Sequence, residues 1–243
     1  MYPGVPGPGL PPRSLIFSRA RHASRAAGPP RLRRRHRLDA AGRQGQPVDL
    51  RLRHAVCPGP VDVARGLLLH APNQGWKNVP IQQMILAQTP DIPRVFVDND
   101  ANLAAFAEYM FGAHKHSADL LYLYLNDGIG GGLILEHGLY RGRLGFAGEV
   151  GHMNVLPDGP CCSCGSHGCA ETLLSWRSVR ATVKGLTGRE LSILEILEAL
   201  RGGNDDLQRS IAQTGKYLGI FLGSLANIFD PKLLIVGGSI ADL

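Results

Sequence analysis

The stretch VFVDNDAN at residues 95–102 contains the change from strand to helix that decides the fold class. Its first three residues are apolar and predict a short buried strand. The next five are Asp, Asn, Asp, Ala and Asn, and Asp and Asn are side chains that cap helix N-termini. Apolar residues then recur at helical spacing, at Leu103, Phe106, Ala107 and Met110. A strand that leads directly into a capped helix is typical of an α/β fold.

The alternation of strands and helices continues on both sides of this stretch. Short apolar runs predict further strands at residues 67–69, 120–125, 133–135 and 233–236. Residues 207–229 have apolar positions near multiples of 3.6 and predict a long helix, which Asp230 and Pro231 end. No covering helix follows the last strand before Leu243, so we expect the fold to be truncated at that end.

Positive charge is concentrated near the N-terminus. The net charge of the 243 residues is +6, but residues 1–56 contain twelve Arg and two Asp, whereas residues 57–243 contain fourteen basic and eighteen acidic residues. The later part is therefore mildly acidic, and it gives no sign of a folded basic surface for nucleic acid. A hydrophobic content of 44% also excludes a wholly disordered or fibrous chain.

Residues 1–56 are expected to form a disordered tail, because Arg and Pro without an apolar period cannot bury enough surface to offset the chain entropy. A misassigned start or a shifted reading frame would also explain the abrupt change near Cys57. A basic arm that binds nucleic acid is a third interpretation. A transit peptide is a fourth, although proline pairs at 11–12 and 29–30 interrupt its amphipathic spacing.

The sequence contains neither an apolar run of about eighteen residues nor a signal-peptide pattern. We therefore expect a cytoplasmic protein with no membrane partner. The cysteines agree with this expectation, because four of the five lie within residues 161–169. Such crowding indicates a metal site and not a dispersed disulfide framework.

Three cysteines and one histidine have the spacing of a zinc site. Cys162, Cys164 and Cys169 form a Cys-x-Cys-x4-Cys run, and His152 lies ten residues before it. Thiolate and imidazole are ligands that tetrahedral Zn²⁺ prefers, and four protein ligands close its shell, so the predicted zinc is structural. A reduced cysteine cluster without metal is the alternative, and Cys161 is left outside the site.

Polar residues near predicted element boundaries are candidates for ligand binding. Asn99 and Asp100 stand where the strand at 95–97 meets its helix, at the sheet end where α/β proteins bind ligands. Helix capping alone is the alternative. Glu149 lies three residues before the predicted histidine ligand, and Glu171 lies two residues after the last cysteine. A rigid metal loop would hold both carboxylates near a ligand, and solvated surface acids are the alternative.

Residues 127–132, DGIGGG, lie between two predicted strands and predict a glycine hairpin. Backbone N–H groups of such a turn can bind phosphate. The candidates are Gly128, Gly130, Gly131 and Gly132. A plain tight hairpin is the alternative. Asp127 opposes phosphate binding, because its negative charge stands beside the place of the anion.

Together these motifs resemble the ROK family, whose name joins repressors, open reading frames and sugar kinases. ROK glucokinases and N-acetylmannosamine kinases share the same motifs, and the resemblance extends from about residue 58 to residue 243. The motifs occur in the family's order. They are PGPVD at 58–62, HAPN at 70–73, NDAN at 99–102, GIGGG at 128–132, GEVGH at 148–152, the Cys-x-Cys-Gly-x-x-Gly-Cys loop and Glu171.

The resemblance implies an actin-like ATPase fold of the ribonuclease H-like type, with a sugar bound between two lobes. Residues 57–115 would be what remains of the N-terminal lobe, and residues 116–243 would be a C-terminal lobe with the zinc loop, incomplete at its C-terminus. The family also implies a homo-oligomer, a dimer.

The ligand implied by the resemblance is a hexose or an N-acetylhexosamine. The sugar-binding residues that match the family motifs are Gly59, Asn73, Asn99, Asp100, Glu149, His152 and Glu171. In a kinase Asp100 would be the general base. His152 would hold zinc with one ring nitrogen and the sugar with the other.

Two departures from the kinases favour a regulator. The family's first phosphate loop, an Asp-Gly-Thr-Lys type segment, is absent from residues 1–56. The second phosphate loop of the kinases resembles Thr-Gly-Ile-Gly-Gly-Gly, whereas this chain has Asp127 in place of the Thr. Family repressors often have an acid there. We therefore expect the sugar-binding effector domain of a transcriptional regulator, whose contact with DNA would need a helix-turn-helix not visible in this chain. The alternative is a sugar kinase without its start, dependent on ATP and Mg²⁺. A scaffold protein with a degenerate cleft is disfavoured, because the acidic residues are present.

Overall fold

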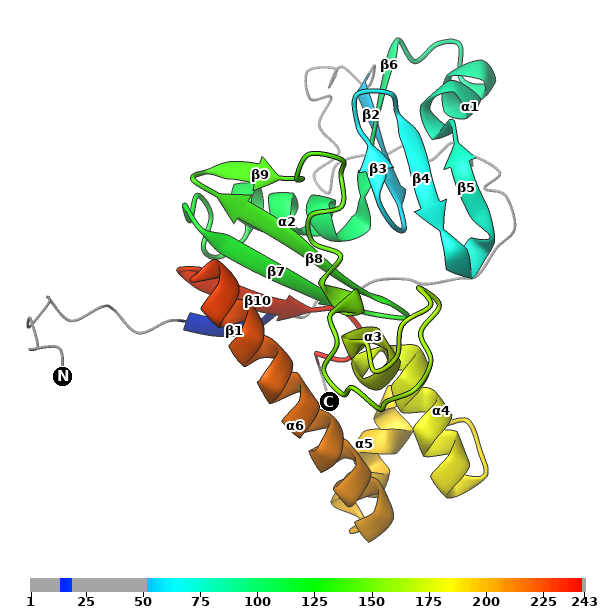
Figure 1. The fold of residues 1–243 in the computed structure, drawn as a ribbon, viewed down its shortest axis with the longest axis vertical. Helices are drawn as coiled ribbons and strands as arrows, with labels where there is room; N and C mark the ends of the chain where they lie inside the picture. Colours follow the sequence, from blue (N-terminus) through cyan, green and yellow to red (C-terminus); the bar gives the residue numbers. More distant parts are fainter. Residues whose placement is uncertain (1–13, 19–51, 242–243) are drawn as a thin grey trace, which may run out of the picture.

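The computed structural model describes residues 14–18 and 52–241, and in them strands and helices alternate along the chain (Figure 1). The strands are β1 (Ser14–Ser18), β2 (Leu52–Cys57), β3 (Val61–Asp62), β4 (Leu67–Ala71), β5 (Trp76–Val79), β6 (Arg94–Asn99), β7 (Leu120–Leu125), β8 (Ile129–Leu135), β9 (Gly138–Tyr140) and β10 (Leu233–Gly237). The α-helices are α1 (Ile81–Gln88), α2 (Asp100–Phe111), α3 (Ala170–Leu174), α4 (Trp176–Thr187), α5 (Ile193–Arg201) and α6 (Asp205–Phe229). Two short 3-10 helices are η1 (Pro72–Gln74) and η2 (Val150–His152). The expected α/β class is confirmed.

The described strands form three sheets. The largest has the order β1-β10-β7-β8-β9, in which β10 is parallel to both β1 and β7 and the other pairs are antiparallel. A parallel pair, β2 and β6, and an antiparallel sheet of β3, β4 and β5 form the two smaller ones. Figure 1 shows the two small sheets and α1 at one end of the molecule, α4 and α5 at the other, and the large sheet between them.

Strand β7 is a continuous run of leucine and tyrosine residues, and its packing explains this composition. Its side chains alternate between the two faces of the large sheet, because successive residues of a strand point to opposite sides. Leu121, Leu123 and Leu125 pack in a core with residues of α3 and α6, whereas Leu120 and Tyr122 pack in a core that includes Ala105 of α2. Both faces of the large sheet are therefore covered at β7, which explains the apolar and aromatic residues along this strand.

The predicted elements around the long helix are found with small shifts in their bounds. The helix expected at 207–229 is α6, whose first turn is capped by the Asn204 side chain, and the strand expected at 233–236 is β10. Asp230 follows α6 with a left-handed backbone at φ 41°, which ends the helix before Pro231. The predicted glycine hairpin is the antiparallel pair β7 and β8.

Two parts of the fold bear on the expected domain bounds. Within the N-terminal segment that was expected to be disordered, the structure describes the strands β1 and β2, which pair with β10 and β6. These strands are short and lie in an Arg- and Pro-rich stretch, so the composition gives no clear sign of them. Helix α2 lies within the predicted first lobe, residues 57–115, and packs against β7 and β8 of the large sheet. The division of the chain at residues 56 and 115 stays a prediction. The remainder of the predicted tail, residues 1–13 and 19–51, lies outside the described residues.

Glycines in β8 allow α2 to approach the sheet closely. A Cβ atom on Gly132 would collide with the carbonyl oxygen of Ala101 and the side chain of Ala105, and one on Gly130 would lie 2.9 Å from the Cβ of Ala101. Any larger side chain would therefore push the helix away from the strand. The glycine run thus has a packing role that determines where the N-terminus of α2 lies.

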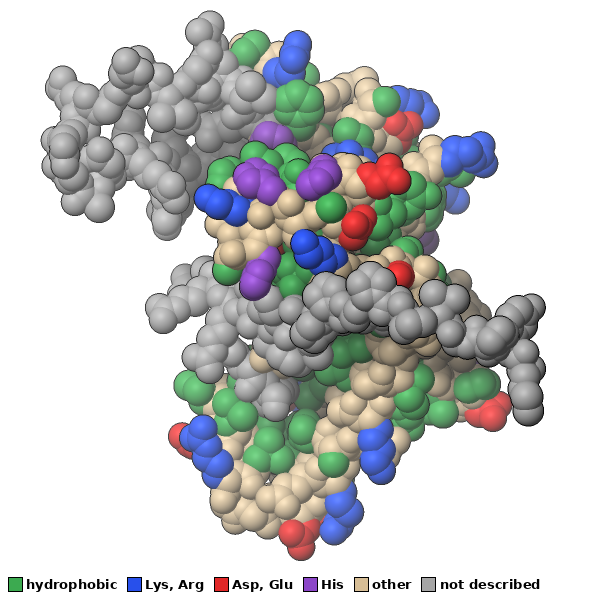
Figure 2. Space-filling model, turned by 90° about the vertical axis from the view of Figure 1, so that its left-hand side faces the viewer, with side chains coloured by type: hydrophobic (Ala, Val, Ile, Leu, Met, Phe, Trp, Pro, Cys, Tyr) green, Lys and Arg blue, Asp and Glu red, His purple; other side chains and the backbone are tan. Residues whose placement is uncertain are grey.

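Figure 2 shows the charged side chains on one face of the molecule. On the coloured part of this face, Lys and Arg side chains are spread among Asp and Glu side chains and do not gather into a basic patch of the kind that binds nucleic acid. Within residues 14–18 and 52–241, no helix is long and apolar enough to cross a membrane.

We predict that Gly132→Ala lowers the free energy of unfolding by about 1–3 kcal/mol, because the added methyl group forces α2 away from β8. Gly219→Ala in α6 is the matched control, since apart from the neighbouring backbone of the helix itself no described atom lies within 4 Å of its Cβ position. That variant should instead gain up to about 1 kcal/mol from helix propensity. Urea unfolding measures both, and equal effects of the two substitutions would contradict the packing role.

Candidate functional site

The junction of β6 and α2 presents the first predicted site residues. Asn99 caps α2, because its Oδ1 accepts hydrogen bonds from the backbone N–H groups of Ala101 at 2.9 Å and Asn102 at 3.1 Å. Asp100 is the first residue of the helix, where the partial positive charge of the N-terminus favours a carboxylate. The capping interpretation therefore holds for Asn99, and its predicted contact with sugar stays a prediction.

Asn99 also connects the junction to the loop between β2 and β3. Its Nδ2 donates to the carbonyl oxygen of Gly59 at 3.1 Å. Gly59 has φ 86°, and a Cβ there would collide with the carbonyl oxygen of His70, so only glycine fits without strain. Asn73 lies on η1, next to β4, and its side chain is not among the described ones. The structure thus brings Gly59 to the junction and leaves the role of Asn73 a prediction.

Glu149 lies in a partly buried loop beside two other carboxylates. Burial, followed by the negative charges of Asp100 and Glu171, raises the pKa of Glu149 to about 7. Burial also raises the pKa of Asp100, although a hydrogen bond from the Ala101 backbone opposes this effect. Glu149 Oε2 lies 3.9 Å from His152 Nε2. Three predicted acids and the predicted histidine are therefore neighbours in space.

Glu171 connects the glycine turn to the cysteine loop. It is the second residue of α3, which begins directly after Cys169. Its Oε2 accepts a hydrogen bond from the backbone N–H of Ile129 at 3.1 Å and stands close to Gly128. The position of this carboxylate therefore depends both on the cysteine loop and on the turn between β7 and β8.

His152, Cys162, Cys164 and Cys169 form a cluster that could hold a metal ion, with their ligand atoms within 4.8 Å of one another. Cys164 Sγ lies 3.7 Å from Cys169 Sγ, and Cys162 Sγ lies 3.5 Å from His152 Nδ1. A tetrahedral zinc ion bonded at about 2.3 Å to sulfur and 2.0 Å to nitrogen would place two sulfurs roughly 3.8 Å apart and a sulfur and a nitrogen roughly 3.5 Å apart. The donor set and its spacing therefore fit zinc.

The two nitrogens of the His152 ring face different groups. Nδ1 is directed to the thiol of Cys162, and Nε2 to the carboxylate of Glu149. The roles expected for the two nitrogens, one on metal and the other on the sugar, stay predictions. Burial and the thiols of Cys164 and Cys162 raise the pKa of Cys169 to about 12, so a cation would be needed to keep the three sulfurs ionised together.

Cys161 lies outside this cluster, as expected. Its Sγ lies 2.9 Å from His167 Nε2, and both side chains are exposed. Cys161 is therefore not a fifth member of the cluster, although it is adjacent to Cys162 in the sequence.

The predicted phosphate-binding glycines occupy two kinds of position. Gly128 lies in the turn, whereas Gly130, Gly131 and Gly132 lie within β8. The backbone N–H of Gly131 donates to the carbonyl oxygen of Gly148 at 2.7 Å. Because Glu171 accepts from Ile129, two of the amides near the turn already have acceptors from the chain itself. Phosphate binding by this set stays a prediction.

Two charged residues matter to the site in ways the sequence did not indicate. Asp98 was noted only as one member of the polar cluster at residues 98–102, and Arg141 was not singled out. In the structure the guanidinium of Arg141 forms an ion pair with the buried carboxylate of Asp98. No sequence signal predicts the pair, because the two residues are 43 positions apart.

Comparison with known proteins identifies the family. The ROK family model matches residues 48–243, and the chain belongs to the ROK family. The match begins before the expected start of the folded part at residue 57, in agreement with the position of β2.

Relatives of both functional kinds are found, and they include xylose repressors and glucokinases. The chain is 35% identical to the xylose repressor of Caldicellulosiruptor bescii over 193 residues, which cover 74% of this chain and 48% of that protein. A solved ROK glucokinase from Streptomyces griseus, in complex with glucose and AMPPNP, has a TM-score of 0.67 and 37% identity and covers 76% of this chain and 64% of that one. A ROK transcriptional regulator, a homologue of E. coli MLC, has a TM-score of 0.67 and 32% identity, covering 77% and 49%. The chain thus spans about half the length of the repressor. The likeness to the solved ROK structures confirms the expected actin-like α/β fold.

We predict that Glu149→Gln stabilises the protein at pH 8 and has little effect near pH 4.5. In the folded state the pKa of Glu149 is about 7 against 4.5 for the free group, so the folded state binds the proton more tightly and loses stability as pH rises through this window. The full cost, up to about 3 kcal/mol, is present above pH 7 and disappears in the glutamine variant.

Urea unfolding at pH 4.5 and pH 8 measures this difference. Glu190→Gln is the control, because Glu190 is an exposed acid in the segment between α4 and α5 and its loss should change stability little at either pH. An effect of Glu149→Gln that is the same at both pH values would contradict the assignment.

Proposed function

We propose that this chain is the sugar-binding effector domain of a ROK-family transcriptional regulator. The observation that carries the proposal is the convergence of Asp100, Glu149 and Glu171 with His152, at the place where α2, η2 and α3 contact β8. The proposed ligand is a hexose or an N-acetylhexosamine, and the xylose repressors among the relatives add a pentose to the sugars that need testing.

The acidic cluster suits a polyhydroxyl ligand. A carboxylate offers two oxygens as acceptors, and hydrogen bonds from a hydroxyl to an ionised acceptor are about twice as strong as neutral ones. Sugar hydroxyls would supply donors to three carboxylates that otherwise repel one another. A neutral sugar thus relieves the repulsion that an anionic ligand would increase.

The glycine turn supports a regulator more than a kinase. Phosphoryl transfer needs positive groups and free N–H donors around the phosphates. Here the N–H of Ile129 donates to Glu171, and the exposed Asp127 precedes Gly128. A carboxylate about 4 Å from a phosphate oxygen would cost roughly 1–4 kcal/mol across effective dielectrics of about 80 to 20.

A sugar kinase dependent on ATP and Mg²⁺ is the second candidate function. The raised pKa of Asp100 favours it, because a base with a pKa closer to neutral takes a proton from a sugar hydroxyl more readily. The likeness to glucokinases also supports it. Asp100 would then be the general base, and the sugar-binding residues would be the same.

Structural zinc is part of the proposal. His152, Cys162, Cys164 and Cys169 would complete a four-coordinate shell, which leaves no position for a reacting ligand. The ion would then hold the histidine ring with Nε2 toward Glu149, and it would fix the start of α3, which carries Glu171.

We predict that the purified protein contains one zinc ion and that Cys164→Ser loses it on treatment with a chelator, because three ligands leave an open and labile site. Elemental analysis before and after dialysis against EDTA measures this. Cys161→Ser is the control in the adjacent position and should retain zinc. Chelator-resistant zinc at one equivalent in Cys164→Ser would contradict the ligand set.

We predict that the chain binds at least one of glucose, xylose, N-acetylglucosamine and N-acetylmannosamine without releasing ADP from ATP. Titration calorimetry with each sugar and a coupled ADP-release assay measure the two properties. Asp100→Asn should abolish binding, because it removes a charged acceptor from the site, whereas Asp158→Asn in an exposed loop should leave binding unchanged.

Two results would contradict this function. ADP release at about 1–1000 per second that is lost in Asp100→Asn would favour the kinase. The absence of binding heat with all four sugars, in protein that contains zinc and unfolds cooperatively, would contradict recognition of these sugars.

A further inference from the structure

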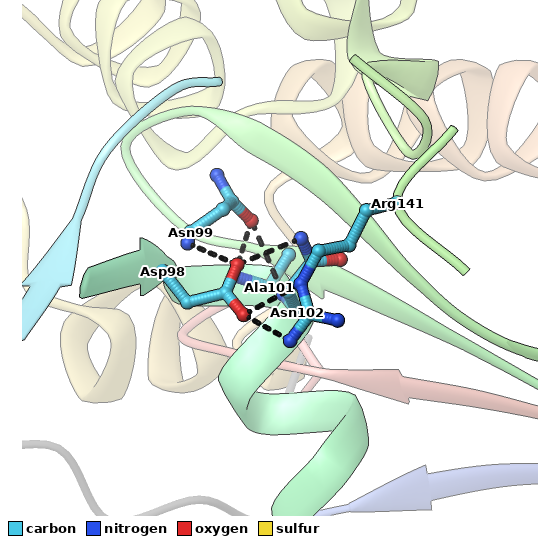
Figure 3. A network of polar contacts seen from close by, with 5 residues as sticks. All are labelled: Asp98, Asn99, Ala101, Asn102 and Arg141. Carbon is cyan, nitrogen blue, oxygen red and sulfur yellow. Dashed lines mark hydrogen bonds and ion pairs between the residues drawn. The ribbon is translucent and has the colours of Figure 1, made fainter. Parts of the chain in front are cut away.

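Arg141 and Asp98 form a close ion pair between two parts of the fold (Figure 3). Nε and Nη2 of Arg141 both donate to Asp98 Oδ2, at 3.0 Å and 2.6 Å. Asp98 belongs to β6 of the small parallel sheet, whereas Arg141 directly follows β9 at the edge of the large sheet. The pair therefore joins the small parallel sheet to the edge of the large sheet, next to the segments that carry the proposed sugar-binding residues.

The second oxygen of Asp98 organises the start of α2. Oδ1 accepts hydrogen bonds from the backbone N–H of Asn99 at 2.8 Å and from Asn102 Nδ2 at 3.1 Å. The other amide atom of Asn102, Oδ1, is buried and has no partner among the described atoms, so that Asp98 is what orients this side chain. Asp98 thus holds the turn that presents Asn99 and Asp100.

The backbone of Arg141 organises the loop that carries Glu149. Its carbonyl oxygen accepts from the N–H of Ala147 at 3.1 Å, and the N–H of Glu149 donates to the carbonyl oxygen of Phe146 at 3.3 Å. In the same loop Gly145 approaches the carbonyl oxygen of Val61 so closely that a Cβ would collide with it. Movement of Arg141 would therefore displace the loop that contains Glu149.

The energetic importance of the pair follows from burial. Asp98 is 4% exposed, and a buried carboxylate is strongly destabilising once its cationic partner is removed. The side chain of Arg141 is 37% exposed, so that its own charge stays accessible to water. Loss of the ion pair would therefore destabilise chiefly the buried Asp98 carboxylate and the turn whose N–H and amide groups it binds.

We propose that Arg141 is a positioning residue that sets the distance between Asp100, at the start of α2, and Glu149, in the loop between β9 and η2. We name these two segments the two walls of the proposed sugar site. The proposal rests on the proposed sugar-binding function. Arg141 acts on the ligand only through Asp98 and through the loop that precedes Glu149.

Arg141→Met tests the proposal, with Arg143→Met, an exposed arginine two residues further on, as the matched control. Calorimetry with glucose, xylose, N-acetylglucosamine and N-acetylmannosamine should give a Kd roughly 10- to 100-fold weaker for Arg141→Met, because small displacements of positioned groups are costly. Arg143→Met should match the unmodified protein. Arg141→Lys, which keeps the charge and loses the two-nitrogen geometry, should lie between them.

A double variant separates positioning from stability. Asp98→Asn combined with Arg141→Met removes the orphaned buried charge and keeps an oxygen for the N–H of Asn99, so the midpoint of urea unfolding should recover relative to Arg141→Met alone. The Kd for sugar should remain weak, since the connection between the two walls is still missing. Recovery of the Kd together with stability would overturn the proposal, as would a Kd for Arg141→Met within twofold of the unmodified protein.

Hydrogen exchange tests the inference independently of sugar. Arg141→Met should increase the exchange of backbone amides in both residues 97–103 and residues 144–151, and it should leave residues 160–169 of the cysteine loop unchanged. Faster exchange confined to residues 140–143 would overturn the proposal. If the unmodified protein binds none of the four sugars, the proposed function fails, and this exchange pattern alone decides the role of Arg141.

Discussion

The buried carboxylate of Asp98 is the interaction on which the arrangement of the site depends. Removing a charge from water is costly, so a buried carboxylate persists only when cations and hydrogen-bond donors surround it. Asp98 obtains these from three places: the guanidinium of Arg141, the backbone of Asn99 and the amide of Asn102. Because these groups come from a strand, a helix and a distant loop, satisfying one charge fixes how three segments meet.

Close backbone contacts impose a second constraint. The glycines of β8 let α2 lie directly on the strand, and Gly148, at φ 91°, brings the loop before η2 against Gly131. Side chains as small as a methyl group would separate these elements. The glycine-rich hairpin thereby places the start of α2, the loop of Glu149 and the turn contacted by Glu171 around one point. Its glycines serve packing whether or not the turn ever contacts a phosphate.

The electrostatics of this point favour one kind of ligand over another. Burial and the nearby charges of Asp100 and Glu171 raise the pKa of Glu149, and Glu149 lies beside His152. A neutral polyol can donate hydrogen bonds from its hydroxyl groups to all three acids. A phosphate would instead add negative charge beside three carboxyl groups. This electrostatic property therefore supports the proposed binding of a neutral sugar, and it is the reason why we place the kinase second. The cysteine loop contributes by position, since it holds His152 at one end and the start of α3 at the other.

Local patterns in the sequence were sufficient to predict the α/β class, the strand at 95–97 with its capped helix, the glycine hairpin and the long helix α6, because each depends on residues adjacent in the chain. The spacing of His152 and the three cysteines predicted their cluster for the same reason. The sequence did not indicate β1 or β2, which are short and lie in an Arg- and Pro-rich stretch, nor that α2 packs on the large sheet. The pairing of Arg141 with Asp98, and the raised pKa values of Glu149 and Asp100, likewise required the tertiary structure. Burial and the approach of charges far apart in sequence are produced only when the sheets come together, so no local pattern encodes them.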